Sequence, residues 1–416
     1  MDGTRSGFSY YFMILKIAFR NTFRQKRRTI LTGLAMIVGF TLLSLTIGLS
    51  DGAYGNIITM FTRNRIGHIQ VHRQGYLDKP SLYKTINNAS TVGETIQSIA
   101  GVEVWTPRVY GAGLGSVGEK STAVQIIGVD VARETEATQF DQKVVEGNTL
   151  TETASHEAVI GKGLAKIAAA TVGSEIVIVS QGADGSIAND LYKIVGIVES
   201  GDDITDRVGC YLHIEDAQEL LVLDGRVHEI VVIVSNIKQV DKITSAIKTQ
   251  LNDSTLDVAP WQVVAKSFYR AMKADQQGDA ISRFVIMLIV AIGVLNTVLM
   301  SVLERTREYG VLKAVGTKPV QIFWIVVCEV VIIALASICV GAILGVLVNY
   351  LLSVYGITYP EEITYGGMKL KTLYAVVNVR CLVIPAITVM LSATIVGLFP
   401  AIKAARIMPA KAMRTH

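Results

Sequence analysis

Apolar residues gather in four long runs along the chain, at residues 29–49, 281–303, 322–352 and 382–402. About 20 consecutive apolar residues are enough for a helix to cross a bilayer, so each run predicts one transmembrane helix. The first two runs are separated by an insert of about 230 residues, which is long enough for one or two domains. The pattern predicts a membrane protein with four transmembrane α-helices and a large domain inserted between helices 1 and 2.

The insert, residues 50–280, switches between the periods of helix and strand. Residues 51–65 continue the helical pattern of the first run, and the sequence GHIQVH after them alternates as a strand does. Further strands are predicted at 102–109, 123–129, 176–179, 192–198 and 229–234, and helices at 92–99, 162–169, 214–223 and 240–251. This mixture predicts an α+β domain.

The segment between the second and third runs, residues 304–321, is charged but also has a helical pattern. Its apolar positions recur at roughly helical spacing: Tyr309, Leu312, Val315 and Val320. Gly316 and Pro319 mark the end of this short helix and the start of the next one. A solvated connector needs no apolar stripe, whereas a helix that docks into a groove of a partner does.

Basic residues indicate the orientation of the chain in the membrane. The linking segment, residues 304–321, carries four basic and two acidic residues. Residues 1–28 and 403–416 are also basic. Because basic residues gather on the cytoplasmic side, we expect both termini and the linking segment there and the large domain outside. Residues 1–28 are predicted to form a basic amphipathic helix on the membrane surface, although plain flanking charge gives the same orientation. Residues 353–381 are expected to be a short external loop.

The charged segment resembles a known family. The pattern ER-x-RE-x-G-x-LKA-x-G between two membrane helices is similar to the coupling loop of ABC-transporter permeases of the FtsX/MacB type, which include the LolC and LolE lipoprotein-releasing permeases. A basic loop that merely obeys the charge rule would leave the apolar stripe unexplained. The resemblance implies that these residues couple the chain to an ATPase: Glu304, Arg305, Arg307, Glu308, Gly310, Leu312, Lys313 and Gly316.

The resemblance also implies partners and a task. ATP and Mg would be bound by a cytoplasmic ABC ATPase dimer and no cofactor by this chain, which would be a transporter subunit without catalytic residues. A second permease copy would complete a homodimer or a LolC/LolE-like heterodimer in the bacterial inner membrane, in contact with membrane lipids. The expected task is extraction of lipoproteins for delivery to the outer membrane through a periplasmic lipoprotein carrier. The alternative is mechanotransmission for export of peptides or antibiotics, or for regulation of a cell-wall hydrolase.

Two finer expectations follow from the same resemblance. The sequences GHIQVHRQGYLD, GEKSTAVQIIGVD and IGKGLAK favour the LolE-like branch over MacB. The inserted domain should contain a mixed part built from both of its ends, around a β-rich centre near residues 110–225. A membrane-anchored enzyme with an external active site is a third hypothesis, but no convergent catalytic set is found in the insert. The modest net charge of +4 gives no reason to expect nucleic acid.

Several residues within the apolar runs are candidates for polar or packing roles. Glu329 lies inside a run, where a carboxylate must pair, protonate or reach the interface. It is expected either to pair with a basic residue of the coupling loop or surface helix, or to reach lipid headgroups. Asn296 is expected to form an interhelical hydrogen bond rather than to bind substrate. Small residues at every fourth position predict a close-packing face: Ser337, Gly341 and Gly345.

Three features of the insert invite a functional interpretation but favour a structural one. The sequence GLGSVGEKS at 113–121 departs from a phosphate-binding loop, because Glu119 separates the second glycine from Lys120. His68 and His72 are predicted on a strand, where about 13 Å between them is too far for one metal ion. A group of aspartates lacks calcium-loop spacing and is expected to form a solvated turn: Asp202, Asp203 and Asp206.

Overall fold

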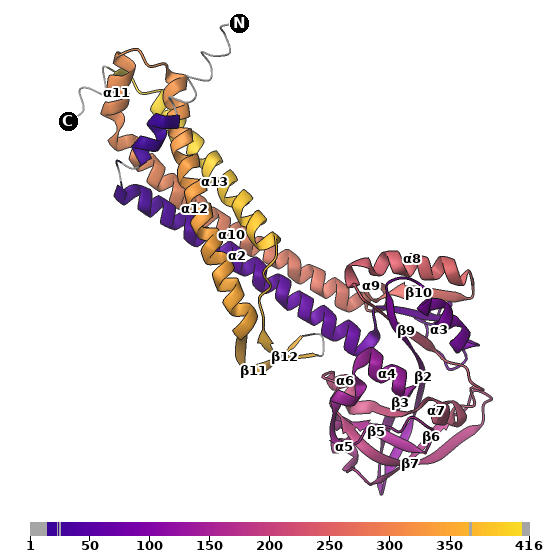
Figure 1. The fold of residues 1–416 in the computed structure, drawn as a ribbon. Helices are drawn as coiled ribbons and strands as arrows, with labels where there is room; N and C mark the ends of the chain where they lie inside the picture. The colour runs from indigo at the N-terminus through magenta and orange to yellow at the C-terminus, as the bar shows by residue number, and fades with distance from the viewer. Residues whose placement is uncertain (1–14, 23, 25, 366–367, 410–416) are drawn as a thin grey trace. The chain divides into compact units, whose positions relative to one another are not determined.

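The computed structural model describes residues 15–22, 24, 26–365 and 368–409 (Figure 1). The beginning of the predicted surface helix and the end of the basic tail therefore lie outside the described residues. The chain forms two compact units. The helical unit comprises Met1–Tyr54, Lys273–Thr358 and Thr372–His416, and the inserted unit comprises Gly55–Met272 with Tyr359–Lys371.

In the described part of the chain, four helices are long and apolar enough to cross a membrane. They are α2 (Lys26–Phe61), α10 (Lys266–Glu304), α12 (Pro319–Tyr355) and α13 (Arg380–Ala405). Each helix contains one of the apolar runs. Helices α2 and α10 extend well past their runs, because backbone hydrogen bonding does not stop where apolar side chains end, whereas α12 and α13 exceed theirs by at most three residues at either end. Helix α2 includes most of the segment 51–65, and a short π-helical turn, η1 (Thr62–Ile66), follows it.

Small residues bring α2 and α12 into close contact. A Cβ atom added to Gly345 would lie 2.8 Å from the hydroxyl of Ser44, and one added to Gly341 would lie 2.9 Å from the side chain of Phe40. Both distances are too short for a real side chain, so only glycine permits this approach. Next to them, the amide of Asn349 donates a hydrogen bond to Ser44 Oγ at 3.1 Å. Glycines at these positions thus fit the close-packing face predicted for this helix.

A ten-stranded sheet forms the centre of the inserted unit, with strand order β10-β1-β9-β2-β3-β8-β5-β7-β4 and β6 paired with β2 and β7. The strands are β1 (Ile69–Arg73), β2 (Val102–Val117), β3 (Lys120–Val129), β4 (Val144–Gly147), β5 (Glu157–Gly161), β6 (Glu175–Gln181), β7 (Ile187–Val198), β8 (Gly209–His213), β9 (Glu229–Val234) and β10 (Leu256–Pro260). Its helices are α3 (Ala89–Gln97), α4 (Val131–Thr138), α5 (Lys162–Ala168), α6 (Asp203–Val208), α7 (Ile214–Leu220), α8 (Val240–Leu251) and α9 (Trp261–Val264), with 3-10 turns η2 (Phe140–Lys143) and η3 (Ile237–Gln239).

Strand β2 joins the two ends of this sheet. From Val102 to Arg108 it pairs with β9, and from Arg108 to Val117 it pairs with β3. The β-rich central part and the part built from the ends of the insert therefore share one continuous sheet, and the change of partner falls at Arg108. The glycine-rich segment at 113–121 is the hairpin between β2 and β3, and Gly118 has the positive φ of +57° that this turn requires.

The segment expected to be a short loop between α12 and α13 contains a hairpin. Strands β11 (Ile357–Tyr365) and β12 (Met368–Leu373) pair with each other in a separate two-stranded sheet. A loop was expected there because proline and acidic residues occur together at Pro360, Glu361 and Glu362. In a two-stranded sheet, however, both strands are edges, and an edge strand tolerates proline.

Candidate functional site

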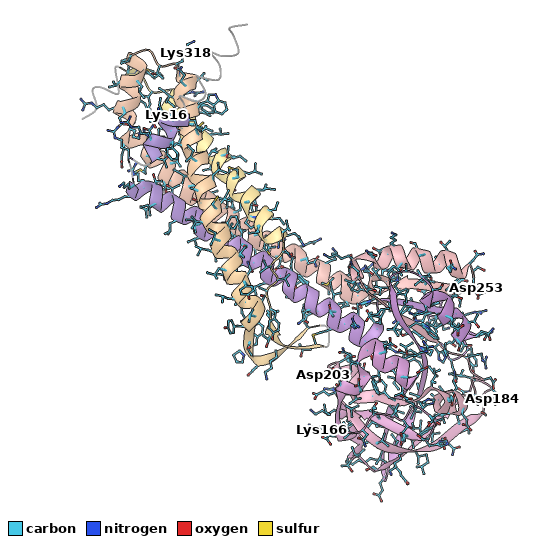
Figure 2. The ribbon with its side chains drawn as sticks, viewed as in Figure 1. Lys16, Lys166, Asp184, Asp203, Asp253 and Lys318 are labelled. Atoms are coloured by element: carbon cyan, nitrogen blue, oxygen red, sulfur yellow. The ribbon has the colours of Figure 1, made fainter. Side chains whose placement is uncertain are left out.

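The coupling segment forms a short helix at one end of the helical unit. Helix α11 (Thr306–Ala314) follows α10 after Arg305, and Gly316, with a φ of +107°, ends it before α12 begins at Pro319. Only glycine adopts such a backbone angle at low cost, so Gly316 fixes the turn. Lys16 and Lys318 lie at this same end, as does α11 (Figure 2).

Arg305 is the buried centre of this end of the bundle, with a relative exposure of 6%. Its Nε donates to Glu308 Oε2 at 3.0 Å, and its Nη1 donates to Glu329 Oε2 at 3.0 Å. Its guanidinium also lies 5.2 Å from the centre of the Tyr309 ring. The carboxylate of Glu329 thus pairs with a basic residue of the coupling segment, which is one of the two alternatives that the sequence left open.

Two arginines at the start of the chain add further ion pairs to this cluster. Arg28 pairs with Glu304, and Arg24 Nη1 lies 3.6 Å from Glu308 Oε1. Arg28 Nη1 is buried, has no hydrogen-bond partner among the residues that the structure describes, and belongs to a residue lining a cavity of about 30 Å³, which Glu329 also lines. That volume suffices for a bridging water. Both arginines belong to the basic segment predicted on the membrane surface, and the structure pairs them with the coupling segment.

Lys313 connects α11 to the C-terminal end of α13. Its Nζ donates to the backbone oxygens of Ala405 and Ile407, both at 2.8 Å. The last carbonyls of a helix lack partners within the helix and carry partial negative charge, so a lysine there satisfies them. Four residues predicted to couple the chain to an ATPase are therefore engaged inside the chain: Glu304, Arg305, Glu308 and Lys313. Arg307 remains exposed.

The apolar stripe of the coupling segment is divided between two directions. Tyr309 is 1% exposed and packs into the bundle, and Gly310 is buried beside it. The exposed apolar side chains form what we call the coupling patch: Val311, Leu312, Val315 and Val320. Val315 is 83% exposed. The expectation that all of the stripe faces a partner is wrong for Tyr309, because helical spacing alone does not show which face the chain itself covers.

The other sequence candidates do not join this cluster. Asn296 lies on the exposed side of α10 and forms no hydrogen bond within the described residues, so the expected interhelical bond within the chain is not made. His68 accepts from the backbone N–H of Val234 at 2.9 Å, whereas His72 contacts Glu229. Asp202 and Asp206 are buried, and the prediction of a solvated turn is wrong for them.

Both buried aspartates have polar partners, and one partner of Asp202 lies far away in the sequence. Asp202 caps α6 by accepting from Ile204 N and pairs with Arg65 at 2.9 Å. Asp206 accepts from the backbone and hydroxyl of Ser200 at 2.9 and 2.7 Å. Local spacing reveals a helix cap, but it does not reveal a cation in a remote segment.

Two family models match most of the chain. The model of the MacB-like periplasmic core domain matches residues 29–250, and that of the FtsX-like permease C-terminal region matches residues 280–409. The chain belongs to the FtsX/MacB family of ABC-transporter permeases. The match confirms the resemblance drawn from the coupling segment, and it confirms four membrane helices with a MacB-like domain between the first two.

Three relatives of this permease show how far the likeness extends. The macrolide export ATP-binding/permease protein MacB of Campylobacter jejuni is 24% identical over 97% of this chain, which spans only 61% of that protein's length. An ABC transporter permease of Methanocaldococcus jannaschii is 24% identical over 96% of this chain and 97% of its own. The lipoprotein-releasing system transmembrane protein LolC of Xylella fastidiosa is 24% identical over 71% of this chain and 74% of its own. Equal identities do not separate these relatives, so the LolE-like branch stays a prediction.

Breaking the Arg305–Glu329 pair from one side should destabilise the permease. Arg305→Met and Glu329→Met should each lower the free energy of unfolding by about 2 kcal/mol, because the remaining charge is buried without its partner. The variant that carries both changes should recover most of this loss, since two apolar side chains replace both charges. Unfolding in mixed detergent micelles measures these effects.

The matched control is Arg307→Met, at the exposed arginine two residues after Arg305, and it should leave the stability unchanged. If the double variant lost as much stability as the two single variants added together, the pair would contribute no mutual stabilisation and the role assigned to Arg305 would be contradicted.

Proposed function

We propose that this chain is the membrane subunit of an ABC transporter and passes movement from a cytoplasmic ATPase dimer to the inserted domain. ATP and Mg belong to the ATPase partner in this proposal, and the chain itself performs no chemistry. Membership of the permease family supports an ATPase partner, since ABC transporters are driven by one. The proposal places α11 and both termini in the cytoplasm and the inserted domain on the periplasmic side of the bacterial inner membrane.

The coupling patch is the observation that carries this proposal. Val311, Leu312 and Val315 are 47%, 39% and 83% exposed on a segment whose Glu308 and Lys313 are engaged within the chain. Exposed apolar side chains grouped on one short helix are typical of a docking surface. Behind them, Arg305 and Lys313 attach the helix to α12 and α13, so a force on the patch acts on several helices at once.

A second permease copy completes the transporter in this proposal. Asn296 supports it, because an amide in the apolar part of α10 has no hydrogen-bond partner among the described residues. Within a membrane, such a group gains most from a partner on another helix. A second copy of α10, or the corresponding helix of a homologue, would supply that partner.

For the substrate, we propose lipoproteins that are extracted from the outer leaflet and delivered to the outer membrane through a periplasmic carrier. The likeness to LolC supports this choice, and the sequence segments of the LolE-like branch favour it. The likeness to MacB supports macrolide export as the alternative, and peptide export or control of a cell-wall hydrolase belongs to the same mechanical scheme.

Charges placed in the coupling patch should release the ATPase. Two buried apolar side chains contribute several kcal/mol to an interface, so a Leu312→Glu and Val315→Glu double variant should retain less than about a tenth of the ATPase after detergent purification. Met408→Glu is the matched control, because Met408 is 61% exposed near the same end and lies outside the patch. Equal recovery of the ATPase with the double variant would contradict the docking role.

The substrate can be identified from what accompanies the complex. The permease–ATPase complex, purified in mild detergent without nucleotide, should carry acylated protein that mass spectrometry detects and that ATP with Mg releases. Burial of an acyl chain contributes about 0.8 kcal/mol per methylene to binding, so such a ligand should stay bound during purification. ATPase activity stimulated by a macrolide, in a complex without acylated protein, would favour export of that compound instead.

A further inference from the structure

The inserted unit contains a cavity of about 630 Å³ on one face of its large sheet. This volume lies in the range of small-molecule sites. The floor is formed by neighbouring positions on three strands, since His72 of β1 pairs with Glu229 of β9, and Glu229 pairs with Arg108 of β2. Tyr110 and Tyr211 continue the floor, and the walls include Lys143 of η2. The permease mechanism proposed above uses none of these residues.

Glu229 is a buried carboxylate whose hydrogen bonds are all long. Its side chain is 7% exposed. Its contacts are Gln70 Nε2 and His72 Nε2 at 3.3 Å, Tyr110 Oη at 3.4 Å and Arg108 Nη1 at 3.5 Å. Ordinary hydrogen bonds to oxygen measure about 2.7–3.2 Å. The carboxylate of Glu229 therefore retains capacity to accept from a bound group.

Arg108 does not satisfy Glu229, because its stronger bonds go elsewhere. Its Nη2 and Nε donate to the two oxygens of Glu134 at 2.7 and 3.1 Å, and its Nη1 donates to the backbone oxygen of Arg65 at 2.7 Å. This bidentate pair lowers the pKa of Glu134 despite burial and raises that of Arg108. The positive charge of Arg108 is thus largely committed to Glu134.

His72 lies beside Glu229 on the cavity floor. Its side chain is 1% exposed, and its Nδ1 is fully buried with no hydrogen-bond partner among the described residues, so Nδ1 does not face the cavity. When Nε2 donates to Glu229, Nδ1 of the neutral ring is an acceptor. The carboxylate of Glu229 is therefore the group that favours a ligand with several N–H donors, as an ammonium has.

The charges around the cavity balance one another. Its lining includes three cationic and three anionic side chains: Arg65, Arg108, Lys143, Glu134, Asp202 and Glu229. A ligand with a net charge would upset this balance in a partly buried site, whereas one with both charges would not. At Lys143, burial lowers the pKa to about 8 although Glu134 opposes this shift. A carboxylate beside Lys143 would stabilise its ammonium form.

The aromatic side chains of the cavity argue against a neutral sugar. Sugars are held by open aromatic faces, but Tyr76 stacks on His72 with ring centres 5.1 Å apart, and Tyr211 packs against Phe140 at 5.0 Å. We propose that the cavity binds a zwitterionic ligand, a free amino acid or short peptide, with its ammonium group at Glu229 and its carboxylate at Lys143.

Calorimetry on the full chain in detergent, titrated with tri-alanine, tests this proposal. Tri-alanine should bind saturably, and N-acetylation or C-terminal amidation of the peptide should each weaken binding roughly tenfold or more, because each removes one charged contact. These ligand changes leave the protein intact, so the test does not depend on how a variant folds. Absence of binding by both tri-alanine and free alanine up to about 10 mM, equal binding of capped and free peptides, or displacement by glucose would each overturn the proposal.

Two substitutions test which residue binds the ammonium end of the ligand and which binds its carboxylate end. Glu229→Gln should weaken the binding of tri-alanine roughly tenfold but barely affect the binding of the N-acetylated peptide. Lys143→Met should weaken the binding of tri-alanine but not that of its amide. The control is Glu103→Gln, whose carboxylate pairs with Arg63 outside the cavity lining, and it should bind as the native chain does. These outcomes are independent of ATPase binding, so the proposed transport function can fail while this inference holds, and the reverse.

Discussion

One buried guanidinium organises the end of the helical unit on which the coupling patch lies. Arg305 has left water, and the cost of its desolvation is offset only while Glu329 and Glu308 stay within hydrogen-bond distance. Glu329 belongs to α12 and Glu308 to α11, so the turn between α10 and α12 is held from both sides. Because losing either partner would leave a charge without compensation, the segment should move as one piece.

In the function proposed above, this arrangement lets a short helix act on a large domain. Helix α10 runs without interruption from Lys266 to Glu304, directly before Arg305, and its first residues belong to the inserted unit. A displacement of the coupling patch is therefore applied to a continuous helix rather than to a flexible loop. The close contact of α2 with α12, which Gly341 and Gly345 permit, adds a second helix that also continues into the inserted unit.

The sequence predicted the elements better than their partners. Strand β9 and helix α8 have the predicted bounds, because period and length identify such elements locally. The pairing of Glu329 was one of two alternatives, since depth in the membrane alone does not choose between headgroups and an arginine. Tyr309 was assigned to the wrong side, and Asp202 to solvent, because both depend on residues far away in the chain. The cavity was missed for the same reason: its floor combines β1, β2 and β9, which only the sheet brings together.

The central claim is that the coupling patch and the inserted domain lie on opposite sides of one membrane. Labelling of intact cells with a membrane-impermeant maleimide tests it directly, in a chain whose four native cysteines are replaced by alanine. A cysteine at the exposed position Asp184 of the inserted unit should react in intact cells. A cysteine at Val315 should react only after the membrane is opened. Labelling of both positions in intact cells would contradict the account.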